Sequence, residues 1–195
     1  MKYVLFMILN LICVVSLALN FFVKKKISIY EPKYEVVKDY SKFEIRKYEE
    51  MFVASSTMKT TSYDESSSNG FRRVAGYIFG GNKSNQKIAM TSPVFMDMDE
   101  SVTMSFVMPP EVTKTNAPEP NDKRVKLEIR PSETLAVIRF GGWASDSKLN
   151  EKVKELKKLL QKEGVDYYGE PIYMGYNPPY QLINRKNEIA LRVKY

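Results

Sequence analysis

The triplet Glu-Ile-Arg occurs twice, at Glu44 to Arg46 and at Glu128 to Arg130. Because they recur, its two glutamates are the first candidates for acid–base chemistry. Two carboxylates can act as general acid and general base when one pocket holds both. The triplets, however, recur at equivalent places of two similar segments. Such recurrence indicates a structural role, such as an exposed strand pair between each glutamate and its arginine. We therefore expect a binding protein and not an enzyme, with a hydrolase as the less favoured alternative.

Composition excludes several other kinds of site. The 195 residues include no histidine and a single cysteine, Cys13. Zinc sites that use histidine, Ser-His or Cys-His nucleophiles and an intramolecular disulfide are therefore excluded. The net charge is +7, but residues 1–26 hold four lysines and no acid, which leaves 26 basic against 23 acidic residues, or +3. A nucleic-acid binder should keep a basic face after this trimming, so no nucleic-acid partner is expected.

The chain starts with a long apolar segment. Residues 3–23 carry no charge at any position, and Lys24, Lys25 and Lys26 follow them directly. A segment of that length spans a bilayer as a helix, so we predict an N-terminal transmembrane helix with residues 1–26 as a membrane anchor. The lysines favour a cytoplasmic globular part. The alternative is a cleaved signal sequence, which would make the protein secreted or periplasmic.

The remainder, a linker at 27–33 and a domain at 34–195, contains an internal repeat. Residues 43–55, "FEIRKYEEMFVAS", match 127–139, "LEIRPSETLAVIR". Each copy is followed by an apolar stripe at helical spacing and then by a glycine that ends the helix. The first stripe is Phe71, Val74, Ala75 and Ile78 before Gly80, and the second is Leu149, Val153, Leu156 and Leu160 before Gly164. The polar residues 59–70 are expected to form a solvated loop before the first helix.

Each half therefore reads strand, strand, helix, strand, strand. The predicted fold class is α+β, with duplicated ββαββ halves forming a distorted β-barrel of about eight strands, flanked by two helices. The run 87–95, "KIAMTSPVF", aligns with 171–180 and is predicted to be a strand interrupted by proline at an edge or bulge. Residues 111–124 are expected to join the halves as a surface loop. A groove between the halves is a natural place for a ligand.

Several runs resemble the SOUL heme-binding protein family over about residues 34–195. They are "YIFGGN", "KIAMTSPVF", "MSFVMPPE", "GYNPPY" and "NEIALRV". The resemblance implies a distorted barrel with two helices, and binding of heme or a related tetrapyrrole in a shallow apolar groove. It also implies kinship with gyrase-inhibitor-like effector domains, which bind amphipathic small molecules and include some hydrolases.

The resemblance places the ligand on the first helix and on the loop before the last strand. The matching residues are Phe71, Val74, Ala75 and Ile78 on the helix, and Tyr180 and Leu182 on the loop. The helix stripe can equally be read as a core stripe, and one edge could serve both purposes. Where the family places basic groups for propionates, this chain has Ser68 and Gln181, so Arg72, Arg73, Arg185 or Lys186 could substitute.

The absence of histidine is a departure from the family, some of whose members are proposed to ligate iron through it. A bound heme would be unligated by the protein or held by methionine or tyrosine. Met58, Met90 and Tyr77 are candidates, although no metal site is predicted. We expect reversible, non-covalent binding of heme or a related tetrapyrrole for buffering or delivery near a membrane. The alternative is a binding module for another amphipathic small molecule.

Overall fold

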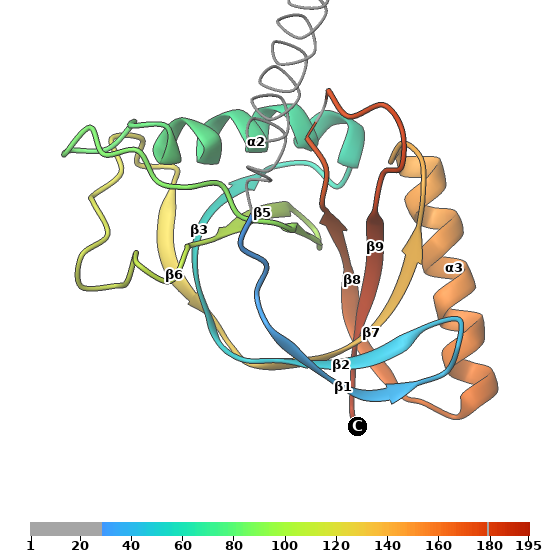
Figure 1. Ribbon diagram of the computed structural model, residues 1–195. Coiled ribbons are helices and arrows are strands. Elements are labelled where there is room, and N and C mark those ends of the chain that lie inside the picture. The colour runs from blue at the N-terminus through green and yellow to red at the C-terminus, as the bar shows by residue number, and fades with distance from the viewer. Residues whose placement is uncertain (1–28, 179) are drawn as a thin grey trace, which may run out of the picture.

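The computed structural model describes residues 29–178 and 180–195, as eleven elements (Figure 1). In chain order they are β1 (Tyr34–Asp39), β2 (Glu44–Tyr48), β3 (Met51–Met58), α2 (Tyr63–Ile78), β4 (Val94–Met98), β5 (Val102–Val107), β6 (Lys126–Arg130), β7 (Glu133–Phe140), α3 (Asp146–Glu163), β8 (Tyr167–Gly175) and β9 (Asn187–Val193). After β1, the order strand, strand, helix, strand, strand occurs twice, which confirms the predicted repeat. No helix in the described ranges is both long and apolar enough to cross a bilayer. The predicted anchor at 3–23 lies outside those ranges and stays a prediction.

The strands form one antiparallel sheet that curls into an incomplete barrel (Figure 1). Its order is β1-β2-β7-β9-β8-β4-β5-β3-β6, nine strands where about eight were expected. Only two residues separate β2 from β3, and only two separate β6 from β7. Because β2 pairs with β7 and β3 pairs with β6, the two pairings are halves of one ladder that bends at these short breaks. The bend curls the sheet, and this gives the α+β, barrel-like fold that was predicted.

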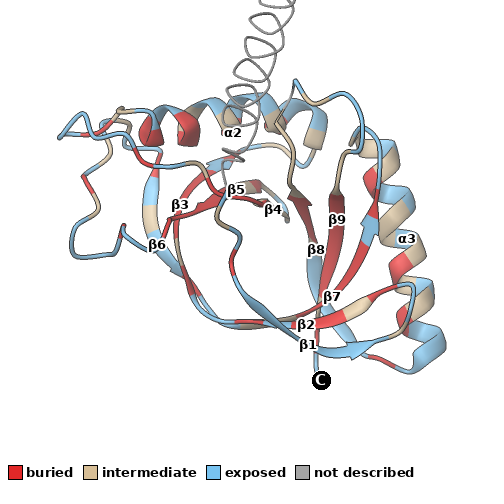
Figure 2. Cartoon of the chain, in the orientation of Figure 1, coloured by how far each residue is buried: buried red, intermediate tan, exposed pale blue. Residues whose placement is uncertain are grey.

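Most strands of the curled sheet are largely buried, as their red segments show in Figure 2, and their side chains form two core clusters. Successive strand residues point to opposite faces. On β7, Leu135 and Val137 enter the inner core, whereas Ala136 and Ile138 enter the core beneath the helices. α2 packs on β3 and β5, and α3 packs on β7, β8 and β9. The two helices therefore cover the outer face, and the apolar inner face is filled by the sheet's own side chains.

Helix α2 begins earlier than its apolar stripe indicates. Residues 63–70, expected to be a loop, form its first two turns. The Ser62 hydroxyl accepts a hydrogen bond from the Glu65 amide, a typical N-cap. Asp146, the first residue of α3, accepts hydrogen bonds from the Tyr63 amide at 2.7 Å and the Ser62 hydroxyl at 2.6 Å. The prediction failed because this stabilisation comes from the other half of the chain.

A glycine follows each helix closely, as the sequence predicted. Gly164 adopts a left-handed conformation with φ of 66° after α3. After α2, the Gly81 amide donates to the Gly76 carbonyl at 2.8 Å. A Cβ at Gly81 would lie 2.5 Å from that carbonyl oxygen, so the approach requires glycine.

The proline-containing run 87–95 is only partly a strand. β4 starts at Val94, directly after Pro93, and lies between β8 and β5 in the middle of the sheet. The expectation of an edge or bulge was therefore wrong, because proline is also tolerated just before a strand begins. Upstream of it, Thr91 forms an isolated bridge to Tyr30.

The repeated arginines are buried and not exposed as expected. The Arg46 guanidinium donates to both oxygens of Glu188 on β9, at 2.9 and 3.3 Å, and Glu188 is fully buried. Arg130 donates to both oxygens of Asp97 on β4, at 2.6 and 3.1 Å. Each arginine therefore crosses from its own half to an acid of the other half. Glu44 does contact Arg46, at 2.6 Å, but Glu128 contacts Ser55 instead of Arg130.

Loss of the Glu188 charge should destabilise the fold strongly. Glu188→Gln leaves the Arg46 guanidinium buried, with only Glu44 as a charged partner, and removal of one member of a buried pair costs about 3–5 kcal/mol. Glu44→Gln is the matched control, because that carboxylate is 35% exposed and such pairs contribute about 0–1 kcal/mol. Urea unfolding at neutral pH measures both free energies. Equal losses in the two variants would contradict the central role of Glu188.

The same pair predicts a pH dependence. Burial opposes the charge on Glu188, but hydrogen bonds and charge from Arg46 outweigh it and hold the pKa of Glu188 below its ordinary value. A carboxyl whose pKa is lowered by folding stabilises the protein above its unfolded pKa, about 4.3, and loses that contribution as the pH falls through the folded pKa. The stability difference between wild type and Glu188→Gln should therefore shrink below about pH 4.3.

Candidate ligand cavity

A cavity of about 640 Å³ lies beside α2 on the outer side of the sheet. Its lining residues are Tyr63, Ser67, Ser68, Phe71, Arg72, Ala75, Gly76, Phe79, Val94, Met96, Met104, Trp143, Tyr173, Gly175, Asn177 and Arg185. They come from α2 and the residue that ends it, from β4, β5 and the end of β8, and from the segments that follow β7 and β8. The lining is mainly apolar and aromatic and contains no carboxylate.

Two other hollows differ in chemistry. A depression of about 670 Å³ around residues 59–65 and 100–101 is lined by polar and charged side chains and has no apolar wall. A hollow of about 380 Å³ opens beside β6 and has a strongly charged lining, in which Arg130 and Arg192 each form ion pairs with Asp97 and Glu133. The cavity beside α2 is therefore the best candidate for an organic ligand.

Aromatic and methionine side chains form the walls and floor of the cavity. Phe71 stacks at a tilt on Phe106 of β5, with ring centroids 5.4 Å apart. Tyr63 meets Tyr173 edge-on at 5.1 Å. Met96 and Met104 are almost fully buried beneath them. These contacts hold this part of the wall in shape, since the side chains named here also pack on the core beneath α2.

Arg185 supplies the positive charge at the rim. Its guanidinium stacks over Trp143 at 4.2 Å and donates to the Gln181 carbonyl at 2.7 Å and the Pro178 carbonyl at 3.1 Å. Its Nε is buried and has no hydrogen-bond partner within the described residues. Arg185 therefore presents its charge and its outer N–H groups to the cavity, whereas the Nε–H is shielded from it.

A hydrogen-bond chain fixes the Trp143 segment. The Tyr173 hydroxyl donates to the Asn187 side-chain oxygen at 2.8 Å, and the Asn187 side-chain nitrogen Nδ2 donates to the Gly142 carbonyl at 2.8 Å. Burial, together with the neighbouring Tyr63, raises the pKa of Tyr173. Burial likewise raises the pKa of Tyr63, although Tyr173 and Arg185 act against it. Both phenols therefore stay neutral at physiological pH.

The structure divides the predicted helix residues into two groups. Phe71, Arg72 and Ala75 line the cavity, and so does Ser68. Val74 and Ile78 do not line it, because they are fully buried beneath α2. The cavity face of α2 is rotated from its core stripe and runs through Phe71, Ala75 and Phe79, at spacings of four. Phe71 and Ala75 belong to both faces, because they line the cavity and also pack on the core. Their contact with a ligand stays a prediction.

The predicted loop residues and iron ligands lie elsewhere. Tyr180 and Leu182 project into solvent and are 82% and 70% exposed. Arg73 does not line the cavity, and Lys186 contacts Glu31 at 3.6 Å. Met58, Met90 and Tyr77 also lie outside the lining, which is a correction of their proposed role. Tyr77, for example, is buried and donates to the Pro118 carbonyl.

Sequence reasoning missed several lining residues. Met96 and Met104 come from β4 and β5, which follow α2 in the chain, and Trp143 and Tyr173 come from the second half. The alternation in "VFMDM" was a signal for Met96, because Phe95 and Met96 must point to opposite faces. No sequence signal places Trp143 beside Arg185.

Known proteins with similar sequences identify the family of this chain. The family model described as SOUL heme-binding protein matches residues 29–192. The chain belongs to the SOUL heme-binding protein family. Human heme-binding protein 2 is 31% identical over 159 residues, 76% of this chain and 77% of that protein. Heme-binding protein 1 of Xenopus laevis is 30% identical over 161 residues, 78% of this chain and 84% of that protein.

Solved structures show how widely the SOUL fold occurs. The EcmrR C-terminal domain superposes with a TM-score of 0.61 at 13% identity, over 83% of this chain and 98% of that one. A hydrolase from Listeria innocua superposes with a TM-score of 0.57 at 17% identity, over 89% and 98%. At such low identities the likeness shows a shared fold and carries no function to this SOUL family member.

Glycine at position 76 can be replaced without strain. It lies within α2, and a Cβ there would meet no atom within 4 Å. Gly76→Ala should stabilise the protein by up to about 1 kcal/mol, the helix-propensity difference between the two residues. Gly81→Ala is the contrasting control and should destabilise by about 1–3 kcal/mol, because its Cβ collides with backbone. Urea unfolding of both variants tests whether the helix face is open.

Proposed function

We propose that the protein binds heme or a related tetrapyrrole reversibly and non-covalently in the cavity beside α2. The observation that carries this proposal is an apolar, aromatic cavity whose described lining includes Arg72 and Arg185 and no carboxylate. Ligand sites are commonly about 300–1,000 Å³ in volume and mainly apolar, with a few polar groups that orient the ligand. The volume of this cavity, about 640 Å³, lies within that range. The SOUL family membership and the names of the two relatives support heme as the ligand.

The lining residues fit the two chemical parts of such a ligand. Phe71, Trp143 and Met104 offer flat or adaptable apolar contact to a macrocycle. Arg72 and Arg185 can meet carboxylate groups at the rim, because a guanidinium pairs with carboxylates through directed N–H donors. No acid lines the cavity within the described residues, so nothing there repels an anionic ligand.

Iron ligation is not required for this binding. The sequence offers no histidine, and tyrosine ligates iron as phenolate, which burial disfavours at Tyr63 and Tyr173. With histidine absent and the tyrosines disfavoured, Met96 and Met104 on the floor are the lining side chains that could still contact iron. We propose a carrier that holds the macrocycle mainly by apolar contact, a mode suited to exchange.

Binding without catalysis is the proposal we favour. A hydrolase needs a nucleophile or an activated water, and the lining has no histidine, cysteine or carboxylate among the described residues. Glu44 and Glu128, the sequence candidates, pair with Arg46 and Ser55 instead and do not line the cavity.

We also propose that residues 3–23 anchor the domain to a membrane, with the domain in the cytoplasm. The support is the uncharged run and the three lysines that follow it. Heme delivery or buffering would then take place close to the bilayer.

Absorbance titration of residues 27–195 with hemin tests the binding proposal, with metal-free protoporphyrin as a second ligand. Saturable one-to-one binding of both is expected, because the apolar walls contact the macrocycle and not the metal. Binding of neither ligand at micromolar protein would rule out the heme proposal and favour another amphipathic ligand. Binding of hemin alone would show that the iron is ligated after all.

A larger side chain at position 76 should close the cavity. Gly76→Phe places a ring in open space on the lining face of α2, so the affinity for hemin should fall at least tenfold while the folded structure is kept. Asn69→Phe, on an exposed face of the same helix and outside the lining, is the matched control and should bind as wild type does. Hemin titration and circular dichroism measure both properties. Unchanged affinity in Gly76→Phe would place the ligand elsewhere.

Carboxylate recognition can be tested separately. Arg72→Gln and Arg185→Gln should each weaken hemin binding about tenfold, because a charged hydrogen bond contributes roughly 1.5–3 kcal/mol. Neither should affect binding of hemin dimethyl ester, which lacks the carboxylates. Arg73→Gln, outside the lining, is the control. Equal weakening for hemin and its ester would show that the arginines act only by shaping the rim.

A further inference from the structure

Segment 180–183 presents an unusual amount of apolar surface to solvent. Tyr180, Leu182 and Ile183 are 82%, 70% and 75% exposed, and they lie almost side by side in the segment before β9. Single exposed apolar residues are ordinary, but a contiguous cluster marks an interaction site. These three side chains do not line the cavity, so the proposed heme binding leaves them unexplained.

The described part of the chain starts next to this segment. The Ser92 amide donates to the Tyr30 carbonyl at 2.9 Å, and the Ser92 hydroxyl donates to the Tyr176 carbonyl at 3.3 Å. Lys186 contacts Glu31 at 3.6 Å. The connection between β8 and β9 rises to the end of the molecule that carries α2 (Figure 1). Ile29 and segment 180–183 therefore belong to one end of the domain.

The predicted anchor must lie close to that end. Val23, the last residue of the uncharged run, is six residues before Ile29. Six residues span at most about 20 Å even when fully extended. If residues 3–23 cross a bilayer, this end of the domain is held against the membrane surface.

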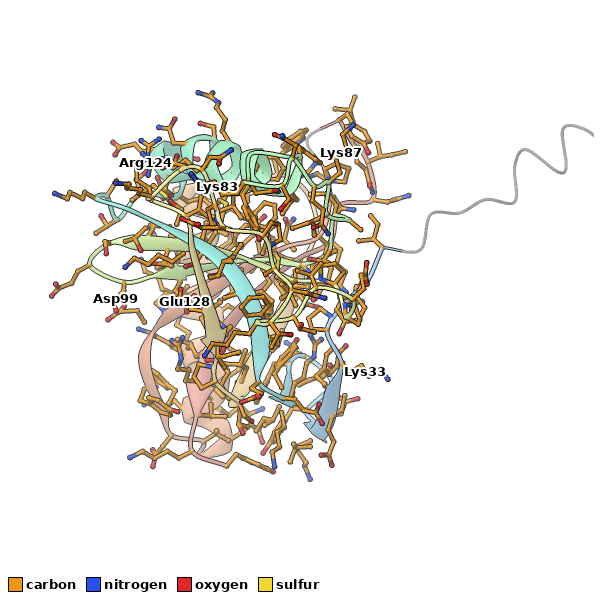
Figure 3. All side chains as sticks on the ribbon, turned by 90° about the vertical axis from the view of Figure 1, so that its left-hand side faces the viewer. Lys33, Lys83, Lys87, Asp99, Arg124 and Glu128 are labelled. Carbon is orange, nitrogen blue, oxygen red and sulfur yellow. The ribbon has the colours of Figure 1, made fainter. Side chains whose placement is uncertain are left out.

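The charges around the exposed segment suit a lipid surface. Arg185 and Lys186 follow it after Asn184, and Lys87 lies beside the end of α2, where the Ile88 amide bonds to the Ile78 carbonyl. Figure 3 shows Lys83 and Lys87 at the end with α2, whereas Asp99 and Glu128 lie lower on the flank. Basic residues next to exposed aromatic and aliphatic side chains are typical of segments that bind at the membrane interface.

We propose that Tyr180, Leu182 and Ile183 insert into the interfacial region of the bilayer that holds the anchor. The inference rests on the proposed membrane attachment. Segment 180–183 is joined to the cavity rim, because Arg185 bonds to the Gln181 carbonyl and stacks on Trp143. Insertion therefore turns the rim, with the exposed rings of Trp143 and Phe79, toward the lipid. A hydrophobic ligand can then pass between bilayer and cavity without crossing water.

The single tryptophan of the chain, Trp143, reports on this contact. The full chain, free of ligand, is reconstituted into vesicles of brominated phosphatidylcholine mixed with phosphatidylglycerol, because bromine quenches tryptophan only at short range. Wild-type emission should fall at least twofold relative to vesicles without bromine. Tyr180→Ser with Leu182→Ser and Ile183→Ser should lose most of that quenching. Val36→Ser with Val37→Ser, on β1 at the end opposite α2, should be quenched as wild type is (Figure 1).

Two further measurements check that the substitutions change neither membrane anchoring nor hemin binding. Carbonate extraction at high pH should leave all three proteins in the vesicles, since the anchor is unchanged. Hemin affinity should be the same in all three, because none of the altered residues lines the cavity. An unquenched wild type overturns the proposal whether or not carbonate extracts it, and equal quenching of wild type and the triple variant overturns it as well. Neither outcome affects heme binding, which the titration measures on its own.

Discussion

Two buried arginines hold the halves of this domain together. Arg46 and Arg130 occupy equivalent positions in the repeat, and each bonds to an acid of the other half, Glu188 or Asp97. Burial alone would disfavour the charge on Asp97, yet Arg130 and Arg192 hold its pKa below the ordinary value. A buried charge without its partner is strongly destabilising, so a register shift of either half by one residue is penalised. The ion pairs thus specify one way of curling the sheet.

That constraint decides where a ligand can bind. The interior of the curl is occupied by the ion pairs and by a core that includes Phe95, Leu135 and Met174. Free volume with apolar walls is found instead on the outer side, where α2 does not fully cover β4 and β5. A ligand there would contact a helix, three strands and two connecting segments. Binding consequently requires little rearrangement of the core.

The repeat made much of the fold predictable, because the two copies could be checked against each other. The helix-ending roles of Gly80 and Gly164 and the strand-helix order follow from short local patterns. The details that failed depend on contacts between halves. Asp146 accepts a hydrogen bond from the Tyr63 amide and so stabilises an earlier start of α2. Arg46 can be buried because it pairs with Glu188, which is distant in sequence. In the cavity, Phe71 and Ala75 could be found from the helix pattern, whereas Trp143 is placed by the Asn187 hydrogen bond that holds its segment.

The chemistry of the cavity favours exchange over tight retention. Iron in a permanent heme site is usually held by a strong axial ligand, and this sequence offers no histidine while burial keeps Tyr63 and Tyr173 protonated. Under the proposed function, apolar contact to the macrocycle would supply most of the affinity, and its strength would scale with the area removed from water. A bilayer would remove the same area of the macrocycle from water, so the free energy of the ligand would differ little between bilayer and cavity. The rim arginine changes that balance, because Arg185 offers a charged, directed donor that the hydrocarbon region of a bilayer lacks.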